Sequence, residues 1–275
     1  MATISIADIK ALREQLGTGM VDTKKALEEA DGDLEKATEI LRLKGAKGNA
    51  KRADRSTSEG LVAARAKGSE AWLIELACET DFVAKNDKFI ALADGVLEAI
   101  VLADAKTLEE ALAAQAATKT VGEVIDDEAA VIGEKIVLRR LSYLTGDAFS
   151  VYLHKTSKDL PPQVGVVVAY TGSDEETARS IAQHISFANP DYLTRDDVPA
   201  DKVAGERRIV EEISRQEGKP EAILPKIVEG RLGAYYKQVA LLEQDYAKDN
   251  SQTVAKVAQA AGLTLTGFAR FKVGA

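Results

Sequence analysis

The chain has 275 residues, of which 45% are apolar and 29% are charged, a composition typical of a folded globular protein with about two compact units. Its 36 lysines and arginines are outnumbered by 44 aspartates and glutamates, which leaves a net charge of −8. Because affinity for phosphate groups depends on cationic side chains, this balance argues against a general nucleic-acid-binding protein. We therefore expect no direct nucleic-acid partner.

One cysteine, Cys78, excludes an internal disulfide framework, and with only two histidines it also excludes the usual four-ligand Cys/His zinc site. No apolar run reaches the roughly 18 residues of a membrane span, and the first residues lack the features of a signal peptide. The chain also lacks a GxxxxGK[ST] phosphate loop, a GxGxxG fingerprint and an HExxH sequence. We expect a cytoplasmic binding protein without membrane contact, cofactor or metal, rather than an enzyme.

The N-terminal segment predicts three short helices. Apolar residues with a 3.6-residue period begin at Ile6 and stop at Gly17, and Asp33 is placed to cap the third helix. Met20 and Val21 start the second helix beside a glycine-containing turn. Their side chains belong either to the core or to a small exposed patch.

The composition changes over residues 44–67. Seven basic residues stand against two acidic ones in this segment, and glycine, serine and threonine interrupt any apolar period. This pattern is typical of a solvated linker, with nucleic-acid contact as the alternative interpretation.

Alternating apolar residues then predict a β-hairpin from strands at 60–66 and 71–78. The elements expected after it are, in chain order, a helix from Asn86, a helix capped by Thr107 and Glu110, a helix over 121–132 that ends at Gly133, a second hairpin from 136–144 and 148–154, a strand over 163–171, a helix capped by Ser173 and Glu176, a projecting helical hairpin over 200–216 and 225–244, a helix from Ser251 to Ala261, and a strand over 263–273. Strand pairs separated by helices predict an α+β fold with antiparallel sheets. The second half loosely repeats the first, which indicates two related subdomains.

Residues 78–86 form the most informative segment, because they connect a strand to a helix and such a connection is normally polar. Phe82 and Val83 break that expectation. One interpretation is a hydrophobic staple that folds onto the following helix, and the other is an aromatic side chain exposed to a partner. Asp81 and Lys85 lie beside it and are placed to pair or to steer a partner.

The remaining reactive side chains favour structural roles. Cys78 lies on the apolar face of a strand and is expected to be buried and inert rather than nucleophilic. His154 ends a strand, where it is either a surface residue or a partner contact. His184 lies on an amphipathic helix and is expected to be structural.

Two segments of the sequence are distinctive, LREQLGTGMVDTKKAL at 12–27 and ETDFVAKN at 79–86. Shorter motifs follow along nearly the whole chain, at 133–140, 184–190, 217–220, 228–232 and 267–271. In this order, the segments resemble the elongation factor Ts family, the guanine-nucleotide exchange factors of elongation factor Tu. The chain departs from the family pattern at Val21, where Met is frequent, and at Lys155, where Gly is common.

The resemblance implies a ubiquitin-associated-like helical domain with a basic linker at 1–55, a first core subdomain at 56–145, and a second at 146–275 with a helical hairpin inserted at about 190–235. It implies elongation factor Tu as the partner, and contacts from Arg13, Met20, Val21, Thr80, Asp81, Phe82, Val83, Ile132, Gly133 and His154. Within this set, Thr80, Asp81, Phe82 and Val83 would dislocate the Mg²⁺ of the partner. The resemblance further implies a homodimer or a 2:2 complex through the helical hairpin.

On the residues alone, two other classes of protein stay open. One is an adaptor or scaffold of the ubiquitin-associated type, which would use the three N-terminal helices. The other is a thiol enzyme that would use Cys78 and His154.

Overall fold

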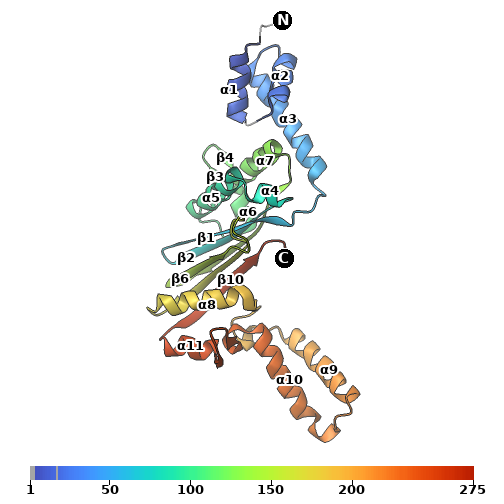
Figure 1. Ribbon diagram of the computed structural model, residues 1–275, viewed down its shortest axis with the longest axis vertical. Coiled ribbons are helices and arrows are strands. Elements are labelled where there is room, and N and C mark those ends of the chain that lie inside the picture. Colours follow the sequence, from blue (N-terminus) through green and yellow to red (C-terminus); the bar gives the residue numbers. More distant parts are fainter. Residues whose placement is uncertain (1–3, 17) are drawn as a thin grey trace.

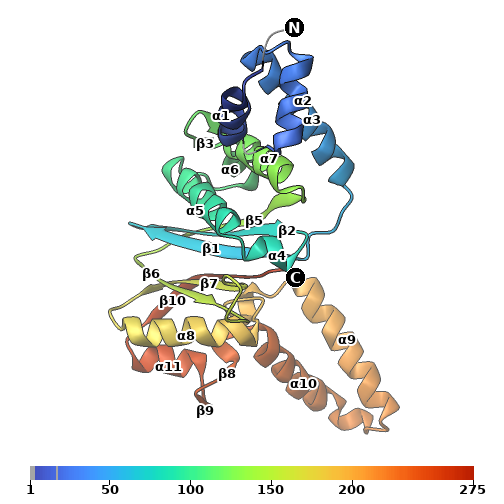
Figure 2. The ribbon, with the colours of Figure 1, turned by 45° about the horizontal axis from the view of Figure 1, so that its top comes forward.

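The computed structural model describes residues 4–16 and 18–275. The molecule is elongated, with a three-helix unit at one end, two stacked β-sheets in the middle and a helical hairpin projecting from the other end (Figures 1 and 2). Both sheets are antiparallel and carry helices on their outer faces, so the expected α+β class is confirmed.

The N-terminal unit consists of α1 (Ile6–Leu16), α2 (Met20–Glu29) and α3 (Leu34–Arg52). Its small core is built around buried residues such as Leu12 and Leu27. The expected cap of the third helix is present, since the Asp33 carboxylate accepts the backbone N–H groups of Glu35 and Lys36. The predicted stop at Gly17 lies outside the described residues.

The prediction of a solvated linker over 44–67 is wrong. Helix α3 continues to Arg52 and the first strand begins at Glu59, so only 53–58 connect the two elements. The second half of α3 packs on α7 (Val121–Ile132), where a Cβ at Gly45 would lie only 2.9 Å from that of Ala130. Tertiary packing therefore stabilises the second half of α3, whose local sequence has no apolar period.

The first sheet has the order β1-β2-β5. Its strands are β1 (Glu59–Lys67), β2 (Glu70–Cys78) and β5 (Ile136–Thr145). The chain between β2 and β5 forms the covering layer, with α4 (Asp81–Ala84), α5 (Asp87–Leu102), α6 (Leu108–Ala113), β3 (Gln115–Ala116), β4 (Lys119–Thr120) and α7. Alternate residues of β2 from Trp72 to Cys78 pack under these helices.

The second sheet has the order β10-β7-β6. Its strands are β6 (Ala148–His154), β7 (Val164–Thr171) and β10 (Thr264–Lys272). Between β7 and β10 the chain forms α8 (Glu175–Ala188), η1 (Arg195–Asp197), α9 (Ala200–Gln216), η2 (Glu221–Ile223), α10 (Leu224–Val239), η3 (Leu241–Glu243), β8 (Asp245–Tyr246), β9 (Asp249–Thr253) and α11 (Val254–Ala260). Each sheet is thus a hairpin joined by a third strand that returns beside the middle strand after a helical excursion.

The predicted second hairpin is wrong in its pairing. Strand β5 pairs with β2, and β6 pairs with β7, so the turn at 145–147 connects the two sheets instead of closing one. Its residue Gly146 donates its N–H to Ser69 O in the first subdomain, and a Cβ at Gly146 would lie 3.0 Å from that of Ala169 in the second sheet. Middle strands β2 and β7 are buried along almost their whole length, and pairing with them buries more apolar surface than local pairing would.

Three predicted helix boundaries also differ from the structure. Helix α8 is capped by Asp174, which accepts the Thr177 N–H at 2.9 Å, and not by Ser173 with Glu176. Helix α10 ends at Val239 instead of Gln244. Helix α11 is capped by Thr253, since the residues from Ser251 onward first complete β9. The predicted domain limits stay predictions.

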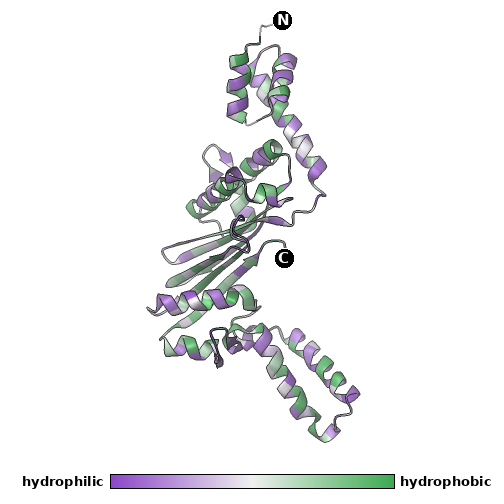
Figure 3. Ribbon diagram, viewed as in Figure 1, coloured by the Kyte–Doolittle hydropathy of each residue, from purple (hydrophilic) through white to green (hydrophobic). Residues whose placement is uncertain are grey.

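The two sheets meet face to face. Val62 and Leu73 from the first sheet pack against Val167 and Ala269 from the second. Figure 3 shows hydrophobic residues along the strands and on the inner sides of the covering helices, with hydrophilic residues outside. Beside this apolar contact, the fully buried Glu75 of β2 meets two guanidinium groups, which lie on β5.

The projecting hairpin is formed by α9 and α10, which close around Val210, Leu224, Val228 and Leu232. Arg195 pairs with Glu243 at its base. None of the helices in 4–16 and 18–275 combines the length and the apolar character that crossing a membrane requires.

Candidate functional site

A four-residue helix, α4, follows the middle strand of the first sheet and presents an aromatic ring to solvent. Thr80 caps it by accepting the Val83 N–H at 3.3 Å. The Phe82 side chain is 74% exposed, and Lys85 Nζ lies 4.5 Å from its ring centroid. Lys85 also pairs with Asp81 at 3.0 Å. The ring is therefore an exposed apolar group flanked by an ion pair.

The opposite side of α4 is anchored in the core. Val83 is 9% exposed and Ala84 is fully buried, and both belong to the cluster under the first sheet's helices. Each of the two interpretations of the Phe82-Val83 pair therefore holds for one of the two residues. Val83 packs against its own chain, and Phe82 is left facing outward.

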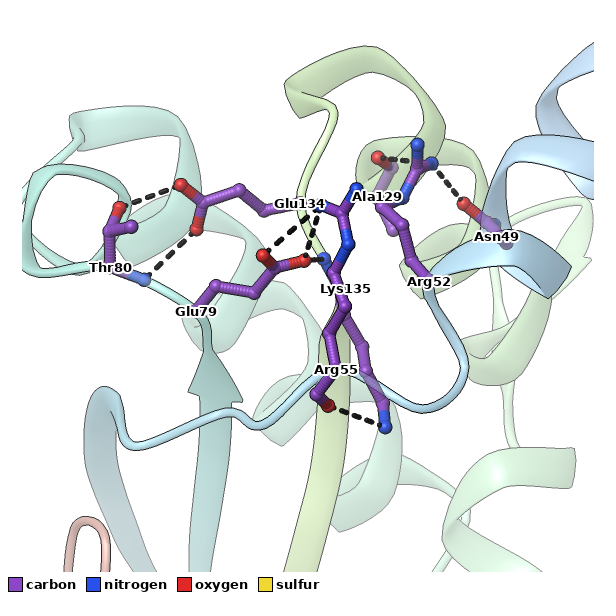
Figure 4. A network of polar contacts seen from close by, with 8 residues as sticks. All are labelled: Asn49, Arg52, Arg55, Glu79, Thr80, Ala129, Glu134 and Lys135. Atoms are coloured by element: carbon purple, nitrogen blue, oxygen red, sulfur yellow. Dashed lines mark hydrogen bonds and ion pairs between the residues drawn. The ribbon is translucent and has the colours of Figure 1, made fainter.

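Two carboxylates connect α4 to the turn that ends α7 (Figure 4). Glu134 accepts the Thr80 N–H at 3.1 Å through one oxygen and the Thr80 hydroxyl at 2.7 Å through the other. Glu79 accepts the Lys135 N–H at 2.6 Å. The turn itself is set by Gly133, whose φ of 85° ends α7 in the left-handed region. Ile132 and Gly133 are consequently held close to α4.

Basic residues at the end of α3 and in the connector after it extend this network toward the N-terminal unit (Figure 4). Arg55 Nη1 lies 3.2 Å from Glu79 Oε2, and Lys135 Nζ donates to Arg55 O at 3.1 Å. Arg52 donates to Asn49 Oδ1 at 2.6 Å and to Ala129 O at 3.3 Å. The connector at 53–58 is therefore tied to the first core subdomain on both sides.

The N-terminal candidates form a separate patch. Met20 is 43% exposed and Val21 is 65% exposed at the start of α2, and Arg13 is exposed on the last turn of α1. Figures 1 and 2 place these helices at the end of the molecule, away from α4. The structure does not bring this patch together with Phe82.

An open groove of about 1000 Å³ lies between the N-terminal unit and the first core subdomain. Residues of α5 and α7 form one wall, and α1 and α3 contribute the other. The groove is lined partly by Leu16, Leu41, Ala91, Gly95 and Val131.

His154 lies at the same end of the stacked sheets as α4. Its carbonyl accepts the Gln163 N–H at 2.9 Å, and the Gln163 side chain donates to Gly60 O at 2.7 Å. Gly60 pairs with Ala77, close to the end of β2 from which α4 follows. The imidazole is exposed, with Nδ1 3.1 Å from the Tyr152 hydroxyl.

The thiol is placed poorly for chemistry. Cys78 is fully buried under the helices of the first sheet, and its Sγ donates to Thr80 O at 3.3 Å. Burial raises the pKa of the Cys78 thiol to about 12, which keeps it protonated. His154, by contrast, belongs to the second sheet. Within 4–16 and 18–275 no group of three or more His, Cys, Asp or Glu side chains is arranged to hold a metal ion.

The carboxylates at 79 and 134 are the residues that sequence reasoning missed. Both lie inside segments that carried the family resemblance, but no role follows from their position in the chain. Their partners are 56 and 54 residues away, respectively, so only the folded structure pairs them.

Comparison with known proteins identifies the family of the chain. The family model described as Elongation factor TS matches residues 79–275. The chain is 74% identical over 276 residues to elongation factor Ts of Leifsonia xyli subsp. xyli, with both chains covered completely. It is also 70% identical to elongation factor Ts of Clavibacter michiganensis subsp. michiganensis and 54% identical to that of Tropheryma whipplei, again with both chains covered completely. The chain therefore belongs to the elongation factor Ts family.

Proposed function

We propose that this chain is the guanine-nucleotide exchange factor of elongation factor Tu in translation elongation. Family membership supports the assignment, and the observation that carries it is the 74% exposed ring of Phe82 on a helix whose other face is buried. An exposed aromatic on a firmly held element is the kind of side chain that anchors protein interfaces.

The proposed mechanism acts on the partner's nucleotide site. A GTPase holds GDP through its phosphate loop and through Mg²⁺, which neutralises phosphate charge. Phe82 enters beside this ion, with Thr80 and Asp81 at the same edge and Val83 holding the helix from below. Displacing the ion weakens phosphate binding and releases GDP. No bond is made or broken in this chain, which acts as an exchange factor and not as an enzyme.

The other candidate residues extend the contact. Ile132, Gly133 and His154 add contacts near α4, and the separate patch of Arg13, Met20 and Val21 touches the G domain of the same partner. Factor and nucleotide then bind with negative coupling, which is mutual, so that GTP binding displaces the factor.

Two finer proposals concern the ends of the molecule. The three-helix unit is proposed to be ubiquitin-associated-like, and its exposed Met20 and Val21 leave an adaptor as the second candidate function. The helical hairpin exposes Ile209, Ile213 and Ile223. Self-association through it, as a homodimer or a 2:2 complex, would appear as a concentration-dependent mass in sedimentation.

Stopped-flow release of a fluorescent GDP analogue from elongation factor Tu tests the function. The wild-type chain should accelerate release, and Phe82→Ala should lose on the order of 2 kcal/mol of this effect, about 30-fold. Its own unfolding free energy should change by less than about 0.5 kcal/mol, because the ring is exposed. Removing Mg²⁺ with a chelator should shrink the gap between the two proteins.

Phe89→Ala is the matched control, since that ring is fully buried in the same subdomain and its loss should cost roughly 3–5 kcal/mol of stability. A wild-type chain that leaves GDP release unchanged, yet captures a ubiquitin-like fold, would replace the exchange function with the adaptor.

A further inference from the structure

Two reciprocal hydrogen bonds join residues 79–80 to residues 134–135 at the edge of the first subdomain. Glu79 binds the backbone N–H of Lys135 at 2.6 Å, and Glu134 binds the backbone N–H of Thr80 at 3.1 Å. In each segment, the glutamate side chain accepts a hydrogen bond from the other segment, and the next residue donates its backbone N–H to the other glutamate. We call these four residues the crossed carboxylate pair (Figure 4).

The crossed carboxylate pair joins the two segments that carry exposed candidate residues. Phe82 follows Thr80 by two positions, and Gly133 directly precedes Glu134. Both segments leave regular structure at this point, β2 at Cys78 and α7 at Ile132. The carboxylates therefore bond each connection directly to the other.

A helix of one turn cannot fix its own orientation, because a single turn gains too few hydrogen bonds to offset its ordering. Helix α4 is held on one side by the buried Val83. Glu134 holds its start through two oxygens, on the Thr80 N–H and on the Thr80 hydroxyl. Hydrogen bonds to a carboxylate are shorter and about twice as strong as neutral ones. Together these two anchors determine the direction in which the Phe82 ring projects.

Glu79 has a second partner that links the cross to the N-terminal unit. Arg55 Nη1 lies 3.2 Å from its carboxylate, and the Glu79 side chain is only 17% exposed. The guanidinium therefore compensates a charge that is largely removed from water. Through Arg55, the connector after α3 is fixed to the same junction.

We propose that Glu134, supported by Glu79, is a positioning residue for nucleotide exchange, which sets the Phe82 ring and the Gly133 turn in one fixed relation. The inference rests on the proposed function. Glu134 touches neither nucleotide nor metal in this role, because it acts through Thr80 and α4. A ring displaced by about 1 Å can cost an interaction of this kind up to a hundredfold.

The central test measures GDP release from elongation factor Tu with Glu134→Ala and Glu134→Gln. The alanine variant loses both acceptor oxygens and should slow release about tenfold or more. The glutamine variant should stay within about threefold of wild type, because its oxygen accepts the Thr80 N–H and its amide donates to the Thr80 hydroxyl.

Glu110→Ala is the matched control. Glu110 accepts the Thr107 N–H at 3.1 Å and the Lys106 N–H at 2.7 Å, so it makes the same type of bond at the cap of α6. Its loss should leave GDP release unchanged. A general effect of removing a capping carboxylate would slow both alanine variants alike.

A double-mutant cycle with Phe82→Ala separates positioning from stability. If Glu134 acts through the ring, adding Glu134→Ala to Phe82→Ala should change release by less than about twofold. Amide hydrogen exchange in the free chain provides the structural readout, and Glu134→Ala should remove the protection of the Thr80 N–H.

The outcomes distinguish the two proposals. A wild-type chain that does not accelerate release overturns the proposed function and the positioning role with it. If the wild-type chain is active and Glu134→Ala is equally active, the positioning role alone is overturned. The same holds if Glu134→Ala slows release by the same factor in the wild-type chain and in Phe82→Ala.

Discussion

The two core subdomains follow the same chain path but differ where the middle strand leads into the first helix. After β2 the chain passes through Glu79 and Thr80 into α4, which exposes Phe82 at 74%. After β7 it turns tightly at Gly172, whose φ is 114°, and enters α8. A Cβ at Gly172 would lie 2.6 Å from Gly262 O, so this second connection is packed against its own subdomain.

The proposed contact segment thus belongs to only one of two similar chain paths. Both connections cap a helix, with Thr80 in the first subdomain and Asp174 in the second. Only the first is cross-linked to a neighbouring turn by carboxylates, and only the first leaves an aromatic ring outside. The helices and sheets therefore provide stability in both halves, whereas the proposed recognition depends on one short segment.

The largest expected effect comes from changing a buried carboxylate between the two sheets. Glu75 is fully buried between the sheets, where it pairs with Arg139 at 3.4 Å and with Arg140, and accepts the Gly274 N–H at 3.4 Å. Glu75→Gln leaves two guanidinium groups without a counter-charge and should cost about 3 kcal/mol of unfolding free energy, since breaking a buried pair typically costs 3–5. Urea unfolding measures this loss.

Exposed Glu98 on α5 is the control, and Glu98→Gln should change the unfolding free energy by less than about 0.5 kcal/mol. If Glu75→Gln lowered the unfolding free energy by less than about 1 kcal/mol, the buried ion pair would add little to stability. Hydrophobic contact alone would then join the sheets.

A smaller effect compares the two helix caps directly. Thr80→Ala and Asp174→Ala each remove a side-chain acceptor from a helix start and should each cost about 1 kcal/mol of stability. The Thr177 N–H lowers the pKa of the Asp174 carboxyl, as expected for a charged cap. Only Thr80→Ala should also slow GDP release, because only Thr80 is bound by Glu134. Equal exchange rates in the two variants would remove the functional difference between the connections.

Much of the fold could be predicted because its signals are local. Asn86 caps α5, Thr107 and Glu110 form a complete capping box, and Gly133 ends α7, all as their residue types indicate. The failures involve distant contacts. Residues 44–52 are helical because they dock on α7, and β5 joins β2 because that strand is buried on both faces.

The segment of the candidate site could be predicted to a similar extent. A polar connection that contains Phe82 left two interpretations, a hydrophobic staple or an exposed aromatic, and the exposure of the Phe82 ring agrees with the second. No local pattern distinguishes the buried Val83 from its exposed neighbour, because a four-residue helix has no period to read. The bonds that join Glu79 to Lys135 and Glu134 to Thr80 cross more than fifty positions, and only folding defines them.

The smallest expected effect compares one buried titratable group from each subdomain. The first contains Cys78, whose thiol stays neutral at ordinary pH. The second buries His184, whose Nδ1 accepts the Ala247 N–H at 3.2 Å, while Nε2 lies 2.9 Å from Gln244 Oε1. With Nδ1 as an acceptor, the proton of the neutral ring is on Nε2. Burial lowers the pKa of His184 from 6.5, because the charged ring would lose hydration, and the hydrogen bond to Gln244 opposes this shift only in part.

The sign of the pH dependence follows from this direction. Well above pH 6.5 the ring is neutral in both the folded and the unfolded chain, and His184 adds no pH dependence. As the pH falls below 6.5, the unfolded chain binds a proton that the folded chain does not, so the unfolding free energy decreases down to the lowered pKa. Urea unfolding between pH 7.5 and about 5 measures this slope, because carboxylates are still largely ionised there. His184→Gln should flatten the slope, and the exposed His154→Gln should preserve it. An unchanged slope in His184→Gln would mean that the acid sensitivity arises elsewhere, and the two subdomains would then respond to pH alike.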